Sequence, residues 1–557
     1  MKKLPGLIGV CLSTIYNEDR FNFIKAMNRK AVEKGYRLLV FNSGTDLYEQ
    51  NNADNEGAAS VFRLIPYKKL SALIIFPNFI YNELIISEMI ENCRKYNIPV
   101  ISVDKKLDGC LNVAFSYGSV FEQICRHVIE VHGARKLFMM TGYKENKFSD
   151  DRTAAFRRAL EANGIPFDEN NVGYGEFWEG PAKDVLCKWF EVEKRELPDA
   201  IICANDTMAI TVSSYLQRKG FKIPDDCIVT GFDGIEQASF HIPHLTTCIQ
   251  DYDSMCSKIT EMIEAVRKGE EPEKEYIAGF NIIYGQSCGC QTINDSNVNL
   301  AIQTLIDRMR RSSERQNMMC TLQSSISKMS DISQLPSILI DKFQFHTAVF
   351  AINDDIFNEP DFGADRKGKN SFSENVFILH QKYYWEDHEK YTIKSAELMP
   401  RYDILAEHEE PIIVCSAHFI DMVLGYCIFQ TDIDVDEYQK IHTFMSAIGA
   451  ALGNFHGRIQ IRKINEKLMT ANDELHILSR RDFMTCLFNR RGFFEMFKRN
   501  LSGEDLSDSN IVVISADLDE LKDTSKNLSF QQKSCPEIGS YLKNSSKMVN
   551  EYAFRAV

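Results

Sequence analysis

Polar side chains stand directly after several apolar runs in the first 290 residues. Asp104 ends "IPVISVD", Asn205 and Asp206 end "DAIICAND", Asp233 ends "CIVTGFD", and Arg152 follows "SDD". A carboxylate, an amide and a guanidinium offer the paired hydrogen-bond donors and acceptors that adjacent hydroxyl groups of a small ligand require. The alternative is that such residues only cap the helices that follow them, as we expect of Asp206 before "TMAI".

The elements that must position these residues alternate along the chain. Short apolar runs predict buried strands, and the segments "FNFIKAMNRKAVEKG" and "TMAITVSSYLQRKG" predict amphipathic helices closed by Gly35 and Gly220. The runs are "GLIGVCLS", "YRLLVFNS", "SALIIFP", "IPVISVD", "RKLFMMTG", "DAIICAND" and "CIVTGFD". Strands separated by helices form parallel sheets, and seven strands are enough for two doubly wound lobes. Ligands of such sheets bind beyond the carboxyl ends of the strands, so the polar residues are predicted to converge.

The segment from "LPDAIICAND" to "HLTTCIQDY" closely resembles the effector-binding core of the LacI/GalR regulators and the periplasmic sugar-binding proteins, and the resemblance covers about residues 5 to 285. It implies a two-lobed, hinged receptor that closes on a sugar-like or nucleoside-like small molecule. It also implies ligand contacts for Arg152, Asn205 and Asp233. Asp104 is also a predicted ligand-binding residue, because it directly follows a predicted strand. Phe177 or Trp178 in "GEFWEG" could stack on a sugar ring, or these rings could pack in the core.

Nucleic acid is not an expected partner. The formal net charge is -14, which disfavours generic attraction to DNA or anionic lipid. The LacI-type repressors carry a helix-turn-helix before this domain, whereas the first predicted strand here begins near Leu7. A transcription regulator is therefore the least favoured of three candidate functions.

The N-terminal apolar run is short and passes into "NEDR", which predicts a core strand rather than a signal peptide, and no run is long enough to span a membrane. We expect a cytoplasmic protein.

The 16 cysteines form no CxxC pair, and most lie in apolar runs. Cys288 and Cys290 in "GQSCGC" bracket a glycine, but a metal there needs two further ligands that the nearby sequence does not supply.

The pattern changes after residue 290. A helical linker is predicted at 291–333. The next segment, 334–455, is predicted to be an α+β domain, with a long helix after the strands "HTAVFAI", "NVFILHQ", "EPIIVCSAHF" and "MVLGYCIFQ". It resembles a GAF-type sensor module. At 456–480 an apolar seam indicates a coiled-coil signalling helix of a parallel homodimer, or an amphipathic helix packed on its own domain. Its residues are Ile461, Ile464, Leu468, Ala471, Leu475 and Leu478.

The last segment, 481–557, begins with "RDFMTCLFNRRGFFEMF" and continues with "NIVVISADLDELKD". It resembles the entry to a diguanylate cyclase (GGDEF) domain, which implies that Asp517 is the vestige of a metal-binding carboxylate. The expected GG(D/E)EF loop would follow "EYAFRAV", and Ser525 and Ser534 replace the residues that bind guanine in that family. We therefore predict a truncated, degenerate GGDEF domain without catalytic residues, which would use Mg²⁺ only if it were complete.

The predicted fold class is a multidomain α/β protein. It comprises a two-lobed doubly wound sensor at 1–290, the helical linker, the GAF-like α+β domain, the coiled coil and a partial α/β GGDEF-like domain. The favoured function is a ligand sensor in signal transduction whose output domain is inactive as it stands. The second is a ligand-regulated diguanylate cyclase of which this chain is an interrupted version, and the third is the LacI-type transcription regulator.

Overall fold

The computed structural model describes residues 5–45, 47, 53–292, 295–329, 334, 345–354, 371–383, 386–387, 391–399, 401–482, 487–501 and 554–555. These residues form two compact units, Met1–Phe455 and His456–Val557. Among the described residues, no helix combines the length and the apolar character that crossing a membrane requires.

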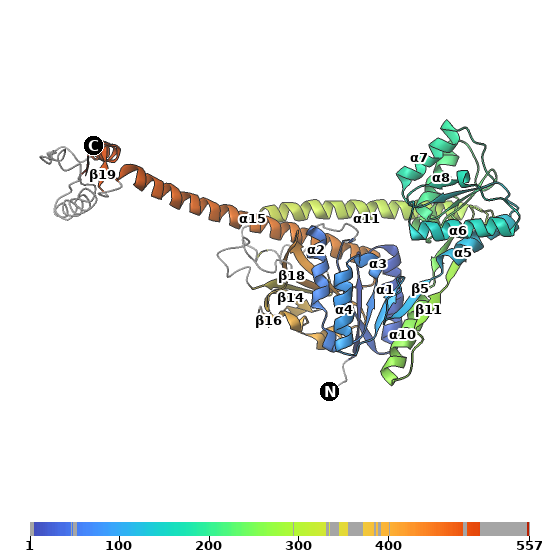
Figure 1. Ribbon diagram of the computed structural model, residues 1–557, viewed down its shortest axis with the longest axis horizontal. Coiled ribbons are helices and arrows are strands. Elements are labelled where there is room, and N and C mark those ends of the chain that lie inside the picture. Colours follow the sequence, from blue (N-terminus) through green and yellow to red (C-terminus); the bar gives the residue numbers. More distant parts are fainter. Residues whose placement is uncertain are drawn as a thin grey trace, which may run out of the picture. The chain divides into compact units, whose positions relative to one another are not determined.

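The first lobe is a parallel sheet in the order β11-β5-β4-β3-β1-β2. The strands are β1 (Gly6–Leu12), β2 (Tyr36–Asn42), β3 (Leu70–Ile75), β4 (Val100–Val103), β5 (Leu111–Phe115) and β11 (Glu275–Ala278). Its helices are α1 (Glu18–Glu33), α2 (Ala53–Ala59), η1 (Ser60–Leu64), η2 (Tyr67–Lys69), α3 (Pro77–Ile80), α4 (Glu83–Lys95) and α10 (Tyr252–Lys268). Figure 1 shows helices on both sides of these strands, as expected for a doubly wound lobe.

The second lobe is a smaller parallel sheet in the order β7-β6-β8-β9. Its strands are β6 (Leu137–Thr141), β7 (Val172–Tyr174), β8 (Ala200–Cys203) and β9 (Ile228–Thr230). The helices are α5 (Tyr117–Glu130), α6 (Lys147–Ala162), η3 (Glu169–Asn171), α7 (Glu179–Cys187), η4 (Lys188–Val192), α8 (Asp206–Arg218) and α9 (Glu236–Phe240). Two further strands, β10 (Thr247–Gln250) and β12 (Phe280–Ile283), pair with each other in antiparallel orientation. The chain passes from the second lobe to the first through β10 and returns through β12.

All seven predicted strands of the two lobes are present, whereas β5, β7, β10, β11 and β12 were not predicted. The missed strands are three to five residues long, and β11 and β12 alternate exposed with half-buried positions along most of their length. Short strands with mixed exposure lack the continuous apolar run by which a buried strand is recognised in a sequence.

The third part of unit Met1–Phe455 is an antiparallel sheet that extends the first lobe. It contains β13 (Thr347–Asn353), β14 (Asn375–Tyr383), β15 (Glu386–Asp387), β16 (Thr392–Lys394), β17 (Ile412–Phe419) and β18 (Met422–Gln430), with η6 (Ser395–Glu397) and α14 (Tyr402–Leu405). The predicted hairpin of β17 and β18 at Ile420 and Asp421 is confirmed, with His418 opposite Val423 and Phe419 opposite Met422. Strand β17 also pairs in parallel with β2, which joins both parts in one 12-stranded sheet of described residues.

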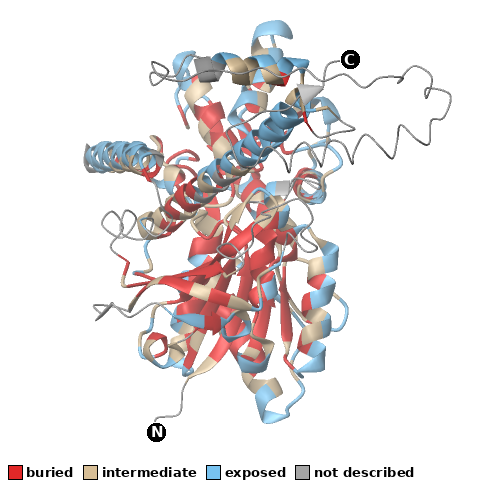
Figure 2. Cartoon of the chain, turned by 90° about the vertical axis from the view of Figure 1, so that its left-hand side faces the viewer, coloured by how far each residue is buried: buried red, intermediate tan, exposed pale blue. Residues whose placement is uncertain are grey.

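This joint sheet is buried on both faces. Alternate residues of β17 enter two different cores: Ile413 and Cys415 belong to one and Ile412 and Val414 to the other. Helices α1 and α10 and the first turns of α15 (Val435–Arg480) cover the first face, while η1 and α4 cover the second. Figure 2 shows the strands as the most buried part of the chain.

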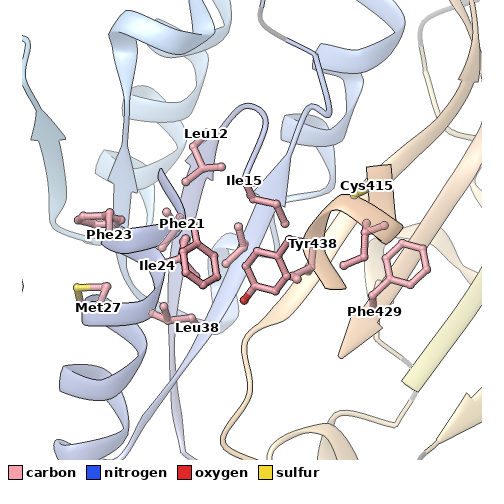
Figure 3. Packing of buried hydrophobic residues seen from close by; sticks show 14 of the residues in the cluster. Leu12, Ile15, Phe21, Phe23, Ile24, Met27, Leu38, Cys415, Phe429 and Tyr438 are labelled. Carbon is pink, nitrogen blue, oxygen red and sulfur yellow. The ribbon is translucent and has the colours of Figure 1, made fainter. Parts of the chain in front are cut away.

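The junction of the two sheets is held by specific contacts as well as by burial. The Phe21 ring of α1 meets the Tyr438 ring of α15 edge-on at 5.6 Å, as Figure 3 shows. The Asn28 side chain donates to the Glu409 carbonyl at 2.9 Å, and Ser416 Oγ donates to the Gly57 carbonyl at 3.1 Å. First lobe and middle sheet therefore behave as one packed body.

Two helices continue the chain. Helix α11 (Asp295–Ser327) lies where the helical linker was predicted, and α15 contains the predicted coiled-coil segment. In unit His456–Val557, α16 (Arg490–Leu501) follows β19 (Phe488–Asn489), which pairs with β20 (Phe554–Arg555) inside "EYAFRAV". Asp517, Ser525 and Ser534 lie outside the described residues.

The Tyr438 side chain gives a test of the junction. It is fully buried, and its hydroxyl has no hydrogen-bond partner among the described residues. Tyr438→Phe is therefore expected to leave the free energy of unfolding unchanged or raise it by up to about 1 kcal/mol, since a buried unpaired hydroxyl is destabilising. Tyr438→Ala is expected to lower it by about 3–5 kcal/mol through the cavity it leaves. Urea unfolding measures both; equal losses in the two variants would contradict this packing.

Candidate functional site

The candidate site lies where the strands of the two lobes end. Asp104 follows β4 of the first lobe, and Asp233 follows β9 of the second. Both have a left-handed backbone, with φ of 58° and 100°. Such a conformation costs a non-glycine residue about 1–3 kcal/mol and persists only where the surrounding structure imposes it. The fold thus holds both carboxyl groups in set positions.

Arg152 of α6 is the centre of this site. Its side chain is 4% exposed, and its Nη2 lies 3.6 Å from Asp233 Oδ1. The guanidinium carbon lies 4.4 Å from the ring centre of Phe232, 5.6 Å from that of Tyr117 and 5.8 Å from that of Phe177. Cation–π contacts with these aromatic rings stabilise the guanidinium where it is removed from water.

Tyr117 connects Arg152 to Asp104. Its hydroxyl donates to Asp104 Oδ2 at 3.0 Å, and the backbone N–H of Phe115 donates to Asp104 Oδ1 at 3.0 Å. We call Arg152, Asp233, Asp104, Tyr117, Phe177 and Phe232 the interlobe cluster. The hydrogen bond from Tyr117 to Asp104 is the contact of this cluster that joins the second lobe to the first.

The electrostatics of the cluster raise the pKa values of both carboxyl groups. Burial raises the pKa of Asp104 to about 6, against the opposing hydrogen bonds from Phe115 and Tyr117. Burial likewise raises the pKa of Asp233 to about 6, and the positive charge of Arg152 opposes this. The negative charge of Asp19, in the first turn of α1, also raises both, so that turn lies close to the cluster.

Comparison with known proteins agrees with this architecture. Residues 126–288 match the family model described as a periplasmic binding protein-like domain. The HTH-type transcriptional repressor PurR of Vibrio parahaemolyticus serotype O3:K6 is 28% identical over 272 residues, which cover 48% of this chain and 76% of that protein. PurR of Aliivibrio fischeri strain MJ11 is 23% identical over 248 residues, covering 44% and 69%. The first half of the chain carries a LacI-type periplasmic-binding-protein-like domain.

Solved structures similar to the LacI-type domain were also found. The Escherichia coli transcriptional repressor ascG is 19% identical, with a TM-score of 0.41, over 51% of this chain and 98% of that one. The transcriptional regulator CelR in complex with cellobiose is 16% identical, with a TM-score of 0.40, over 51% and 86%.

The predicted site residues of the LacI-type domain are only partly brought together. Arg152, Asp233, Asp104 and Phe177 belong to the interlobe cluster. Asn205 supports it: its Nδ2 donates to the Phe177 carbonyl at 3.1 Å, while its Oδ1 accepts from the Met208 N–H at 2.9 Å as the N-cap of α8. Trp178 is 64% exposed, and its Nε1 donates to the Tyr143 hydroxyl at 3.2 Å.

The predicted capping role of Asp206 is wrong. Asn205 caps α8, and Asp206 is the first residue of the helix, fully buried, with its Oδ2 accepting from the Ile235 N–H at 2.9 Å. Asp206 thereby fixes the loop after Asp233. An Asn-Asp pair offers two capping candidates, and only the backbone path between β8 and α8 decides which one is used.

Three residues near the site were missed. Tyr117 and Phe232 belong to the cluster, and Arg20 of α1 is 4% exposed, with its guanidinium 3.8 Å from the ring centre of Phe79. Phe232 sits inside "GFD", one residue before a predicted ligand contact, and this position was a usable signal. Tyr117 follows β5, the strand that was not predicted, so its place at a sheet edge could not be foreseen.

Asp104→Asn tests the electrostatics of the cluster. The pKa of Asp104 is about 6 in the folded chain, above that of an exposed Asp, so the folded state keeps a proton that the unfolded state releases. Its contribution to stability is fully present below about pH 4 and lost as the pH rises through about 6. The melting temperature of the ligand-free wild type should therefore fall more steeply with pH across this window than that of Asp104→Asn.

Differential scanning calorimetry from pH 4 to 8 measures this difference, and the exposed Asp108 in the same loop provides the control Asp108→Asn. The two variants are expected to diverge, with Asp104→Asn the more stable at pH 8. Parallel curves for wild type and Asp104→Asn would show that this carboxyl does not titrate as described.

Proposed function

We propose that the chain is a cytoplasmic signal-transduction protein that senses a small polar ligand, sugar-like or nucleoside-like, between the two lobes of its LacI-type domain. The observation that carries this proposal is the interlobe cluster. Arg152 is buried, it lies 3.6 Å from Asp233, and its Nε has no hydrogen-bond partner among the described residues. A buried donor of this kind is destabilising unless a partner reaches it.

The chemistry of the cluster selects a hydroxyl-bearing or amide-bearing ligand. The separation of Arg152 and Asp233 is longer than a hydrogen bond, so adjacent ligand groups can bridge the two, one accepting from the guanidinium and the other donating to the carboxylate. The half-buried Phe177 ring could supply an apolar face for the flat side of a sugar or a base, while the fully buried Phe232 ring packs behind Arg152. Such a ligand replaces the missing partner and stabilises the closed lobes.

Lobe closure has a path to the signalling helices. Glu18 Oε2 of the first lobe accepts from the Glu236 N–H of the second at 2.9 Å, and Arg308 of α11 pairs with the Glu236 carboxylate at 2.8 Å. Further along α11, Arg311 and Arg315 pair with Asp436 in the first turn of α15 at 3.2 and 2.8 Å. Helix α11 thus touches both the second lobe and α15.

We take the β13–β18 sheet as a GAF-type module that supports this contact.

A parallel homodimer completes the proposal. In α15 the predicted seam is largely exposed: Ile461 is 62%, Leu468 61% and Leu478 68% exposed. An exposed apolar stripe at heptad spacing is stabilised when two copies bury it against each other. A shift or rotation of the paired helices would then carry the signal.

For the segment after α15 we propose a diguanylate-cyclase-like domain in which Ser525 and Ser534 stand in place of the guanine-binding residues, so that it turns over no GTP. Its support is the "NRR" motif, which closes the end of α15: Asn489 Nδ2 donates to the Ser479 carbonyl at 2.8 Å, and Asn489 Oδ1 accepts from the Gly492 N–H at 2.9 Å. Arg480 pairs with Glu495 at 2.8 Å. A ligand-regulated cyclase remains the alternative for a longer form of this protein.

The third candidate function is transcription regulation, which the relatives named as PurR repressors favour. Binding of a specific DNA sequence that survives physiological salt distinguishes it from the signalling function.

Asp233→Ala tests the ligand site. It removes the carboxylate that faces Arg152, so the ligand loses an acceptor and the guanidinium loses its counter-charge. In a thermal-shift screen of sugars and nucleosides, a hit that raises the wild-type melting temperature should give no rise in Asp233→Ala. Asp184→Ala, at an exposed position on α7 of the same lobe, should keep the full rise. An unchanged rise in Asp233→Ala would place the ligand elsewhere.

Leu468→Arg tests the dimer. A charge at the centre of the seam cannot be buried against a second copy, so the variant should shift from dimer to monomer in sedimentation velocity. The control is Thr470→Arg, which places the same side chain on an exposed position of α15 outside the seam. Identical sedimentation of both variants and wild type would contradict the coiled coil.

A further inference from the structure

Two histidines and two cysteines from distant segments meet at one point of the second lobe. His127 lies in the last turn of α5 and His132 just after it, whereas Cys288 and Cys290 belong to "GQSCGC" after β12. One donor atom from each residue lies within 4.8 Å of every other. Neither the interlobe cluster nor the proposed signalling function uses these residues.

The distances fit a tetrahedral metal centre. The two Nε2 atoms lie 3.1 Å apart, and Cys290 Sγ lies 3.3 Å from His127 Nε2 and 3.4 Å from His132 Nε2. Cys288 Sγ lies 3.7 Å from His127 Nε2. Zinc bonds of about 2.0–2.1 Å to nitrogen and 2.3 Å to sulfur, arranged tetrahedrally, place the ligand atoms about 3.3–3.8 Å apart.

The backbone explains why the four side chains converge. Gly289 between the cysteines has a φ of 93°, a conformation that a residue with a side chain rarely adopts, and the turn lets Cys288 and Cys290 both reach the histidines. His132 stands beside Gly133, whose φ of 73° ends the turn after α5. Cys288 is buried and Cys290 exposed, so an ion can enter without unfolding of the lobe.

We propose that His127, His132, Cys288 and Cys290 bind one Zn²⁺ ion that fixes the end of the LacI-type domain to α5. Two thiolates and two imidazoles complete a closed four-ligand shell, which is typical of structural zinc and leaves no position for a substrate. Binding releases the thiol protons and links metal occupancy to the stability of the lobe.

The position of this site gives the ion a mechanical role. Helix α11 begins at Asp295, shortly after Cys290, and then contacts the second lobe again through Arg308 and Glu236. The metal and the ion pair together hold α11 at two points of the same lobe. Movement of that lobe is then transmitted to α11 rather than absorbed by a loose connection.

The alternative is that the cluster binds no ion. In that case the His127 and His132 imidazoles share a hydrogen bond, and the thiols of Cys288 and Cys290 lie beside them. It differs from the metal site in what can be measured. A metal-free cluster neither retains zinc nor gives cobalt a thiolate environment.

The test uses the full chain, purified under reducing conditions with Zn²⁺ in the growth medium. Elemental analysis should find about one zinc per chain after dialysis, and Co²⁺ substitution should give the strong visible absorption of a tetrahedral thiolate site. Removal of the metal by a chelator should lower the melting temperature, and returning Zn²⁺ should restore it.

Two variants make the assignment specific. Cys290→Ser and His132→Ala alter side chains that are not fully buried, and both should lose most of the bound zinc and the response to the chelator. Cys320→Ser, at an exposed cysteine of α11, should keep both. The proposal would be overturned if the wild type contained no zinc and gave no cobalt spectrum. It would also be overturned if Cys290→Ser kept its full zinc content. Neither result depends on finding the proposed small ligand.

Discussion

The parallel pairing of β2 with β17 is the constraint on which the rest of the first unit depends. The outer strand of a parallel sheet presents unpaired N–H and C=O groups, and here β17 satisfies them along Leu39 to Phe41. Both cores of the first lobe then continue without a break into the β13–β18 sheet. A packed interior of this kind moves as a rigid body, so the first lobe cannot shift against the base of α15.

Rigidity on this side leaves the second lobe as the part that can move. Its sheet is separate, and β10 and β12 join it to the first lobe through a short antiparallel pair. Its contacts with the first lobe include the side-chain hydrogen bond from Tyr117 to Asp104 and the bond from the Glu236 N–H to the Glu18 carboxylate. Helix α11 is attached to the second lobe through Arg308 and Glu236 and to α15 through Arg311, Arg315 and Asp436, so it connects the second lobe to the larger body.

The interlobe cluster is a poor arrangement for stability and a good one for binding. It contains two left-handed aspartates, two carboxyl groups with raised pKa values and a buried guanidinium with an unpaired nitrogen. The left-handed backbone and the unpaired nitrogen destabilise the ligand-free chain at any pH, and the buried carboxyl groups do so above about pH 6. A ligand with matching donors and acceptors would relieve the polar groups. Departures of this kind from the local rules of folding are expected at functional sites.

The parts of this protein that depend on local pattern could be predicted from the amino-acid sequence. Seven buried strands, the helices α1, α8 and α11, the β17–β18 hairpin and the acidic and basic residues at strand ends all follow from periodicity and turn chemistry within short windows. The contacts between distant segments, in contrast, are visible only in the folded chain. Leu39 and Ile412 pair across more than 370 residues, and His127 and Cys290 meet across 163, with no local signal for either contact. The physical reason is that an open strand edge or a metal-ligating side chain specifies the chemistry of its partner, while the folded chain alone specifies where that partner lies.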